Sequence, residues 1–296
     1  MNGIINVYKE PDFTSFDVVA KLRGILKQKK IGHTGTLDPA ATGVLPVCLG
    51  NATKLCDMLT DRTKEYRAVL LCGITTDTLD TTGTILTQSD VNVSEEDVRK
   101  AVQKYTGTYE QIPPMYSALK VDGKRLYELA REGKEVERKG RTVTIFECEI
   151  EKIELPRITL RVSCSKGTYI RSLCDDIGRE LGCGGAMEKL VRTRSGRFSI
   201  DQAYTISEIE KFRDEGKLEE IILPVEEALS EYKKVSVKPE YKKLVDNGNP
   251  LPSEAFLETP DFTVRVYNCE GEFFALYTLR EEEGRYYPDK VFPKEV

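Results

Sequence analysis

The segment from Gly32 to Lys54, GHTGTLDPAATGVLPVCLGNATK, combines the residue types that nucleophilic or acid–base chemistry needs. His33, the one histidine of the chain, lies five positions before Asp38. The residues around Asp38 are too rich in Gly, Thr and Pro to form a helix, and the apolar run Val44–Leu49 that follows is typical of a strand. A carboxylate on a stiff loop at a strand edge could act as a nucleophile, acid or base. Because Asp before Pro also begins ordinary turns, the segment alone leaves both interpretations open.

Two further positions carry side chains that suit a pocket for a nucleobase. Tyr66 begins the predicted strand Tyr66–Cys72. It is either an ordinary packing residue or a platform on which a flipped base stacks. Arg171 lies in the run KGTYIR, where a predicted strand turns into a predicted helix. Its guanidinium either lies on the helix surface or holds a carboxylate through two parallel bonds.

Hydrophobic periodicity predicts the elements that must position these residues. Thr14 and Asp17 have the spacing of a capping box before an amphipathic helix, and Ser94 has the character of a second helix cap. The other predicted helices lie near residues 52–59, 125–131, 168–181, 207–214 and 225–230. The predicted strands are residues 3–8, 44–49, 66–72, 142–152, 158–164, 187–198, 263–267 and 273–279.

The order of these elements predicts an α+β fold with a mixed, mostly antiparallel sheet in residues 1–230. From about Lys233 the pattern changes to short β-like runs separated by turn residues. We therefore expect a boundary near residue 230 and a small β-rich domain in residues 231–296.

The net charge of −5 is unevenly distributed along the chain. Residues 201–296 hold 22 Asp and Glu against 13 Lys and Arg, whereas residues 1–200 hold 27 against 31. The basic runs Lys21–Lys30, Lys134–Arg141 and Lys189–Arg197 are candidates for phosphate contacts. Each run by itself is more often an ordinary solvated surface than a binding site.

The eight cysteines form no C-x-x-C pair, and one histidine makes a mixed Cys/His zinc site hard to assemble. They are interpreted as reduced thiols, most of them buried. No apolar run approaches the roughly 20 residues of a membrane span, and the N-terminal residues lack the pattern of a signal peptide. A cytoplasmic location is the expectation.

The run Gly32–Lys54 resembles, without a gap, the catalytic motif of the TruB family of tRNA pseudouridine synthases. The resemblance continues through KEYR around Tyr66, through KGTYIR, and through KLVRTRSGRF from Lys189. It implies an isomerase that converts the T-loop uridine 55 of tRNA to pseudouridine and needs no cofactor or metal. It also implies that the C-terminal region is a PUA-type RNA-binding domain, although its acidity departs from what an RNA binder is expected to carry.

The resemblance assigns roles to particular residues. It makes Asp38 the catalytic aspartate, Tyr66 the platform that stacks on the uracil, and Arg171 the partner of the Asp38 carboxylate. His33 then inserts into the tRNA loop as a wedge, although the residue type also allows a general base. The remaining implied pocket residues are Lys9, Asp80, Tyr169 and Leu190.

Three other functions remain open on the sequence. A non-catalytic RNA-binding or folding factor could use the same surface, but the intact set of Asp38, Tyr66 and Arg171 argues against it. A guide-RNA-dependent synthase is disfavoured by the segment Pro113–Arg131, which matches the bacterial branch of the family. An aspartate-nucleophile hydrolase would need a second poised carboxylate, for which Asp80 is the candidate. We expect tRNA as the partner, with no guide RNA and no obligatory protein subunit.

Overall fold

The computed structural model describes residues 1–121 and 123–292. A large sheet runs through the middle of the molecule in the order β1-β3-β12-β4-β11-β10-β7, with β2 paired to β3 and β13 to β12. Its strands are β1 (Gly3–Lys9), β2 (Ile31–His33), β3 (Thr42–Leu49), β4 (Lys64–Cys72), β7 (Gly107–Gln111), β10 (Arg141–Glu154), β11 (Arg157–Cys164), β12 (Gly185–Ser195) and β13 (Phe198–Ser199). The pairing of β12 with β3 is parallel and the other pairings are antiparallel, so the sheet is mixed. The predicted α+β fold class is confirmed.

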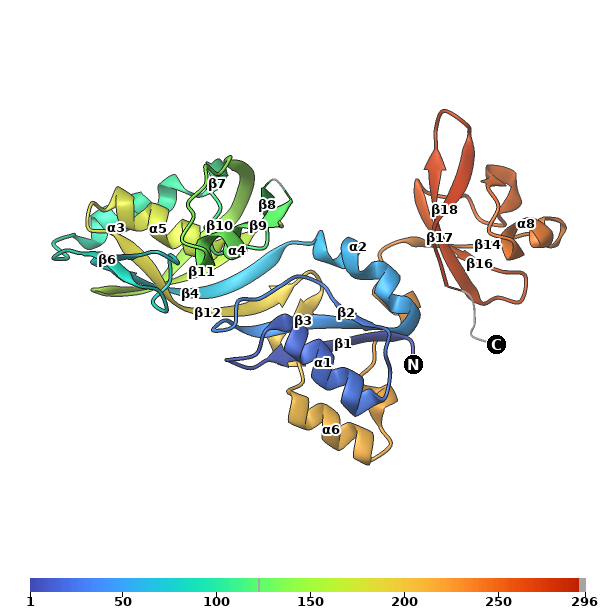
Figure 1. Ribbon diagram of the computed structural model, residues 1–296. Helices are drawn as coiled ribbons and strands as arrows, with labels where there is room; N and C mark the ends of the chain where they lie inside the picture. Colours follow the sequence, from blue (N-terminus) through green and yellow to red (C-terminus); the bar gives the residue numbers. More distant parts are fainter. Residues whose placement is uncertain (122, 293–296) are drawn as a thin grey trace.

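Helices cover the sheet in two groups (Figure 1). The helices are α1 (Ser15–Leu26), α2 (Cys56–Thr60), α3 (Glu95–Lys104), α4 (Leu126–Arg131), α5 (Ile170–Glu180), α6 (Ile206–Asp214), α7 (Val225–Ala228) and α8 (Lys242–Asp246). Short 3-10 turns are η1 (Gly50–Leu55), η2 (Ile200–Gln202), η3 (Leu218–Glu220), η4 (Pro239–Tyr241) and η5 (Ser253–Ala255). α3 and α5 share a core with β4, β10 and β11, whereas α1 and α6 share one with β1 and β3.

A second sheet forms the C-terminal region, in the order β14-β16-β17-β18-β15. Its strands are β14 (Lys233–Ser236), β15 (Leu251–Pro252), β16 (Thr263–Tyr267), β17 (Phe273–Arg280) and β18 (Arg285–Val291). Figure 1 shows this sheet standing apart from the large one, with a core of its own. A third cluster, which includes Leu55, Ala228, Leu276 and Phe292, joins it to the rest of the protein.

Two small hairpins complete the structure beside the large sheet. They are β5 (Ile74–Thr76) with β6 (Ile85–Gln88), and β8 (Lys120–Val121) with β9 (Lys124–Arg125). No helix in residues 1–121 or 123–292 is long and apolar enough to cross a membrane.

Several predicted elements differ from the observed ones at their ends. The helix expected over residues 168–181 begins at Ile170, because Tyr169 has extended backbone angles and serves as its N-cap. The helix expected near residues 52–59 is divided into the 3-10 turn η1 and the short helix α2. The strand expected over residues 187–198 ends at Ser195, where a turn at Gly196 leads into β13.

Candidate active site

Asp38 lies on the loop between β2 and β3, and the first residues of β3 pair in parallel with β12. The loop returns through Gly43, whose φ of +102° an L side chain rarely adopts. A Cβ at Gly43 would lie 2.2 Å from the carbonyl oxygen of Arg192 in β12. Glycine at this position therefore lets the two strands meet, which sets the start of β3 and with it the Asp38 loop.

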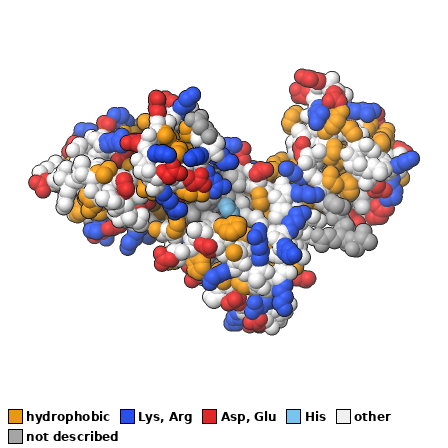
Figure 2. Space-filling model, viewed as in Figure 1, with side chains coloured by type: hydrophobic (Ala, Val, Ile, Leu, Met, Phe, Trp, Pro, Cys, Tyr) orange, Lys and Arg blue, Asp and Glu red, His pale blue; other side chains and the backbone are white. Residues whose placement is uncertain are grey.

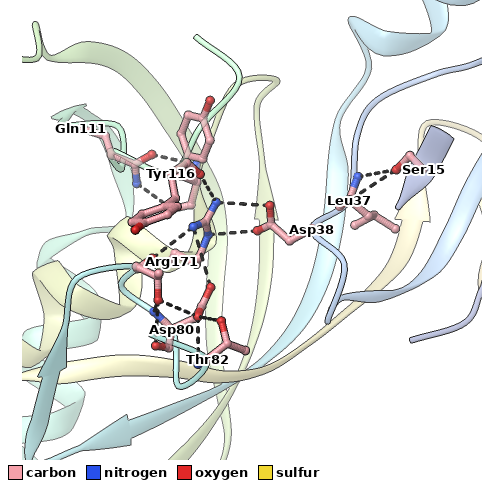
Figure 3. A network of polar contacts seen from close by, with 10 residues as sticks. Ser15, Leu37, Asp38, Asp80, Thr82, Gln111, Tyr116 and Arg171 are labelled. Atoms are coloured by element: carbon pink, nitrogen blue, oxygen red, sulfur yellow. Dashed lines mark hydrogen bonds and ion pairs between the residues drawn. The ribbon is translucent and has the colours of Figure 1, made fainter. Parts of the chain in front are cut away.

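The Asp38 carboxylate is held by Arg171 at the first turn of α5 (Figure 3). Arg171 Nε lies 3.0 Å from Asp38 Oδ2, and Arg171 Nη2 donates to Asp38 Oδ1 at 3.2 Å. The Arg171 side chain is 5% exposed, whereas that of Asp38 is 38% exposed. Two parallel contacts fix the direction of the carboxylate, and its open side leaves room for a substrate.

Arg171 also connects the Asp38 loop to two other segments. Its Nη1 donates to the carbonyl oxygen of Thr78 at 3.1 Å, and its Nη2 donates to that of Tyr116 at 2.9 Å. Asp80 Oδ2 lies 3.8 Å from Nη1. The guanidinium is thus buried among acceptors from three loops, which gives it one defined orientation.

Asp80 is itself fixed within the loop between β5 and β6. Its Oδ1 accepts hydrogen bonds from the Thr78 hydroxyl at 2.8 Å, from the Thr82 hydroxyl at 2.6 Å and from the Thr82 amide at 3.0 Å. The amide of Met187 in β12 donates to the carbonyl of Leu79 at 3.0 Å, which attaches the loop to the large sheet. Asp80 therefore supplies a second negative charge at a fixed distance from Arg171.

Lys9 lies under the Asp38 loop rather than in the open pocket. Its side chain is completely buried, and Nζ donates to the carbonyl oxygens of Ala41, Pro39 and Glu10 at 2.6, 2.9 and 3.1 Å. Burial lowers the pKa of Lys9 to about 8, against the opposing attraction of Asp38. The observed geometry is that of a backbone clamp for the residues that follow Asp38.

Burial has the largest effect on the pKa of the Asp38 carboxyl. Burial raises the pKa of the Asp38 carboxyl above its ordinary value, the positive charge of Arg171 opposes this, and the negative charge of Asp80 adds to it. The Asp38 carboxylate is therefore more basic than a carboxylate in water, and its two contacts with Arg171 hold it in one orientation.

Tyr66 and Leu190 lie on the paired strands β4 and β12. Tyr66 on β4 is 9% exposed, Leu190 on β12 is 8% exposed, and both share a core with Leu37 of the Asp38 loop. Burial raises the pKa of Tyr66, and the charge of Arg192 opposes this. The charge of Asp38 adds to this rise, so the Tyr66 hydroxyl lies within electrostatic range of the Asp38 carboxylate.

Tyr169 and His33 are the remaining pocket residues that the resemblance implies. The Tyr169 amide donates to Gln111 Oε1 at 2.8 Å, and Gln111 Nε2 returns a bond to the Tyr169 carbonyl at 3.1 Å. This clamp fixes the start of α5 and hence Arg171. His33 ends β2, and its ring reaches the surface near the middle of the face in Figure 2, where it is drawn in pale blue. Burial lowers the pKa of His33, and Arg192 acts in the same direction.

The expectation that the run Lys189–Arg197 contacts phosphate is wrong for Arg192. This side chain is 1% exposed, and it donates to the carbonyl oxygens of Val44 at 2.6 Å and Gly35 at 3.1 Å. Arg194 is half exposed but pairs with Glu65 at 3.2 Å. Regular alternation would place Arg192 and Arg194 on the same face of β12, but a register shift between them turns the first inward and the second outward, so a basic run in a strand does not make one surface.

Four positions that shape this site are marked by no pattern in the sequence. They are Ser15, Thr78, Gln111 and Tyr116. Thr78 and Tyr116 contribute backbone carbonyls, which every residue type has, so no pattern of residue types could indicate them. Ser15 and Gln111 act through side chains whose partners lie 22 and 58 residues away.

A cavity of about 610 Å³ lies beside this site, between α5, α4 and the segment from Ile112 to Tyr116. Tyr116 and Ser172 line it, whereas Asp38 and Tyr66 do not. In residues 1–121 and 123–292 no three His, Cys, Asp or Glu side chains gather as metal ligands.

Two family models match successive parts of the chain. Residues 23–170 match the TruB family pseudouridylate synthase N-terminal domain, and residues 171–230 match the tRNA pseudouridylate synthase B C-terminal domain. The chain belongs to the TruB family. The Lachnoclostridium phytofermentans protein named tRNA pseudouridine synthase B is 52% identical over 99% of this chain and 100% of its own length. The Alkaliphilus oremlandii protein of the same name is 49% identical over 96% of this chain and 95% of its own.

Solved structures of larger assemblies share this TruB-family fold. A chain from an H/ACA RNP bound to a substrate RNA containing 2′-deoxyuridine has a TM-score of 0.74 and 27% identity, covering 99% of this chain and 85% of that one. A chain from a Cbf5-Nop10-Gar1 complex has a TM-score of 0.74 and 28% identity, with 99% and 84% covered. The likeness includes the C-terminal sheet, because almost the whole of this chain is aligned.

Proposed function

We propose that this protein is a free-standing tRNA pseudouridine-55 synthase, which isomerises one T-loop uridine of tRNA. The observation that carries the proposal is the fork from Arg171 to Asp38, which holds a half-open carboxylate. Tyr66 is buried in the core that includes Leu37, the residue before Asp38. Membership of the TruB family and relatives near 50% identity over almost the full chain support the same activity.

The reaction breaks the bond between uracil N1 and ribose C1′ and forms a bond between C5 and C1′. The hydrogen on C5 leaves as a proton, and N1 gains one, so no electrons are exchanged with a second reactant. Asp38 acts at the ribose or the ring, by attack at C1′, by addition at C6 or by removal of the C2′ proton. Each of these needs the ionised carboxylate that Arg171 orients.

The remaining residues bind the extruded nucleotide. Because a stacked uridine hides its C1′ and C6 atoms, the base must flip out of the T loop. Tyr66 then stacks on the uracil and helps to remove the C5 proton, with Leu190 and Tyr169 along the pocket walls. His33 fills the space that the base leaves in the loop.

We propose tRNA as the sole partner needed and the cytoplasm as the place of action. The relatives that resemble this chain over their full length are named as tRNA enzymes, whereas the guide-RNP structures cover it at lower identity. The C-terminal residues 231–296 then serve as a PUA-like domain that contacts RNA. Their separate sheet and core support treating them as one unit.

The test uses unmodified tRNA that carries tritium at uracil C5, with no other protein or RNA added. Tritium release mapped to the T-loop uridine is the expected result. D38N, which keeps size and fold, should bind tRNA and release none. A tRNA with cytidine at that position serves as the substrate control. Binding without tritium release by the parent protein would favour an RNA-folding factor, and activity only with added guide RNA would favour the guide-dependent class.

A further inference from the structure

Ser15, at the first turn of α1, is hydrogen-bonded twice to the residue that precedes Asp38. The amide of Leu37 donates to Ser15 Oγ at 2.9 Å, and the Ser15 hydroxyl lies 3.4 Å from the Leu37 carbonyl oxygen. Ser15 is 1% exposed and Leu37 is 3% exposed, so water does not compete for these groups. Figure 3 shows this pair on the opposite side of Asp38 from Arg171.

The Ser15 hydroxyl is not needed to begin its own helix. Thr14 is the N-cap of α1: its hydroxyl accepts from the Asp17 amide at 3.0 Å, and the Asp17 carboxylate accepts from the Thr14 amide at 2.8 Å. This capping box satisfies the helix terminus without Ser15. The contacts of Ser15 with Leu37 therefore join two parts of the structure that are 22 residues apart in the chain.

With the hydrogen bonds between Ser15 and Leu37, the backbone is held on both sides of Asp38. Lys9 holds the carbonyls of Pro39 and Ala41 after Asp38, and the Asp12 amide donates to the Pro39 carbonyl at 3.0 Å. Before Asp38, the Leu37 amide is held by Ser15. A carboxylate that accepts a fork at 3.0 and 3.2 Å loses that geometry if its backbone moves by about an ångström.

We propose that Ser15 is a positioning residue for the isomerisation, which sets the orientation of Asp38 through the Leu37 peptide and does not touch the substrate. This inference rests on the proposed function, because it assigns Asp38 to the reaction. Loss of the hydroxyl leaves the buried Leu37 amide without an acceptor, and the loop then moves to find another one.

The test compares S15A, S15C and T14A with the parent in single-turnover assays at saturating tRNA. S15A should slow pseudouridine formation about tenfold or more while tRNA affinity stays within twofold, because orientation and not binding is lost. S15C, whose thiol fills nearly the same space but is a weak acceptor, should also slow the reaction. T14A is the matched control: it weakens the start of the same helix without touching Leu37, so its rate should stay within twofold even where its melting temperature falls.

Either S15A or S15C turning over within twofold of the parent would overturn the proposal, as would a loss in T14A as large as that in S15A. If S15A does not fold, S15C decides; if neither folds, the hydroxyl is structural and the proposal fails. Failure of the proposed function would look different from failure of the Ser15 proposal, because the parent protein itself would then form no pseudouridine.

Discussion

Arg171 and Asp38 lie 133 residues apart in the chain, yet two contacts of 3.0 and 3.2 Å join them across the pocket. Because α5 presents the guanidinium and the loop between β2 and β3 presents the carboxylate, the ion pair joins these two segments. The pairing was expected from the family resemblance, and its consequences for rate, acidity and stability can be tested separately.

Arg171→Lys should lower the single-turnover rate about a hundredfold while tRNA affinity is nearly unchanged. Lysine keeps the charge but offers a point charge on a flexible stem, so it cannot form both contacts with Asp38 or keep those to Thr78 and Tyr116. Rates on saturating tRNA provide the measurement. Arg179→Lys, on the exposed side of the same helix, is the control. A loss of less than threefold in Arg171→Lys would show that the fork does not orient the reacting carboxylate.

Asp80→Asn should move the acidic limb of the rate–pH profile to lower pH. The charge of Asp80 raises the pKa of Asp38, and only the ionised carboxylate is competent, so removal of that charge lets Asp38 ionise earlier as pH rises. Single-turnover rates from about pH 4 upward, with folding checked at each pH, give the midpoint. Asp77→Asn in the same loop, where Asp77 binds the Thr84 amide at 2.8 Å, is the control and should leave the midpoint in place. A midpoint that rises in Asp80→Asn contradicts the electrostatic account.

Lys9→Met should remove a pH dependence from the free energy of unfolding. The folded pKa of Lys9 is about 8 against an ordinary value of 10.5, so between these values the unfolded chain binds more protons. Stability contributed by this group therefore rises with pH across that window, by about 3 kcal/mol at most. Denaturant titrations at pH 7.5 and 10 measure it as the difference between parent and variant. Burial also lowers the pKa of Lys64 to about 8, but Lys64 is present in both proteins, so its contribution cancels in the difference.

The elements with strong local signals were predicted well from the sequence. The capping box expected at Thr14 is present, Ser94 caps a helix as expected, and each is followed by the expected helix. The long alternating strands β10 and β11 were also predicted, because their period-2 pattern extends over many residues. The strands that were missed are short or polar, such as β2 and β7, and they are strands because their neighbours supply hydrogen-bond partners.

The sequence predicts the parts of the site in which particular side chains carry the chemistry. It does not predict the parts that depend on contacts with backbone atoms. Asp38 and Arg171 are paired, and Tyr66 shares a core with Leu37, the residue before Asp38. The position of Lys9 beneath the loop could not be inferred, because a lysine that binds three carbonyls has no distinguishing sequence pattern. The roles of these residues in the reaction stay predictions until the variants are measured.

Arg192→Ala should destabilise the protein far more than Arg194→Ala. The first change empties a buried site and leaves the carbonyls of Val44 and Gly35 without their donor, which costs about 3 kcal/mol or more. The second removes a half-exposed partner of Glu65 and costs about 1 kcal/mol or less. Urea unfolding of both variants measures the difference. Equal losses of unfolding free energy in the two variants would mean that the buried contacts of Arg192 do not stabilise the fold.

Salt dependence of tRNA binding should come from exposed lysines and not from Arg192. Lys21, Lys27, Lys29 and Lys30 are exposed on and after α1, and Figure 2 shows basic side chains gathered on the part of this face where Figure 1 places α1 and α2. Each phosphate contact contributes about 0.7–0.9 to the slope of log affinity against log salt. The double variant Lys27→Gln and Lys29→Gln should therefore flatten the slope by about 1–2.

The matched control for this measurement is Lys290→Gln together with Lys233→Gln, which removes the same charge from the C-terminal sheet. Filter binding of D38N and of its lysine variants at 50–300 mM salt isolates binding from turnover. If the two double variants flatten the slope equally, the salt dependence of tRNA affinity follows the overall charge of the protein, and α1 makes no specific phosphate contact. If only the C-terminal pair flattens it, the acidic C-terminal region provides the main phosphate contacts despite its net charge, and the assignment of binding to the basic N-terminal residues is wrong.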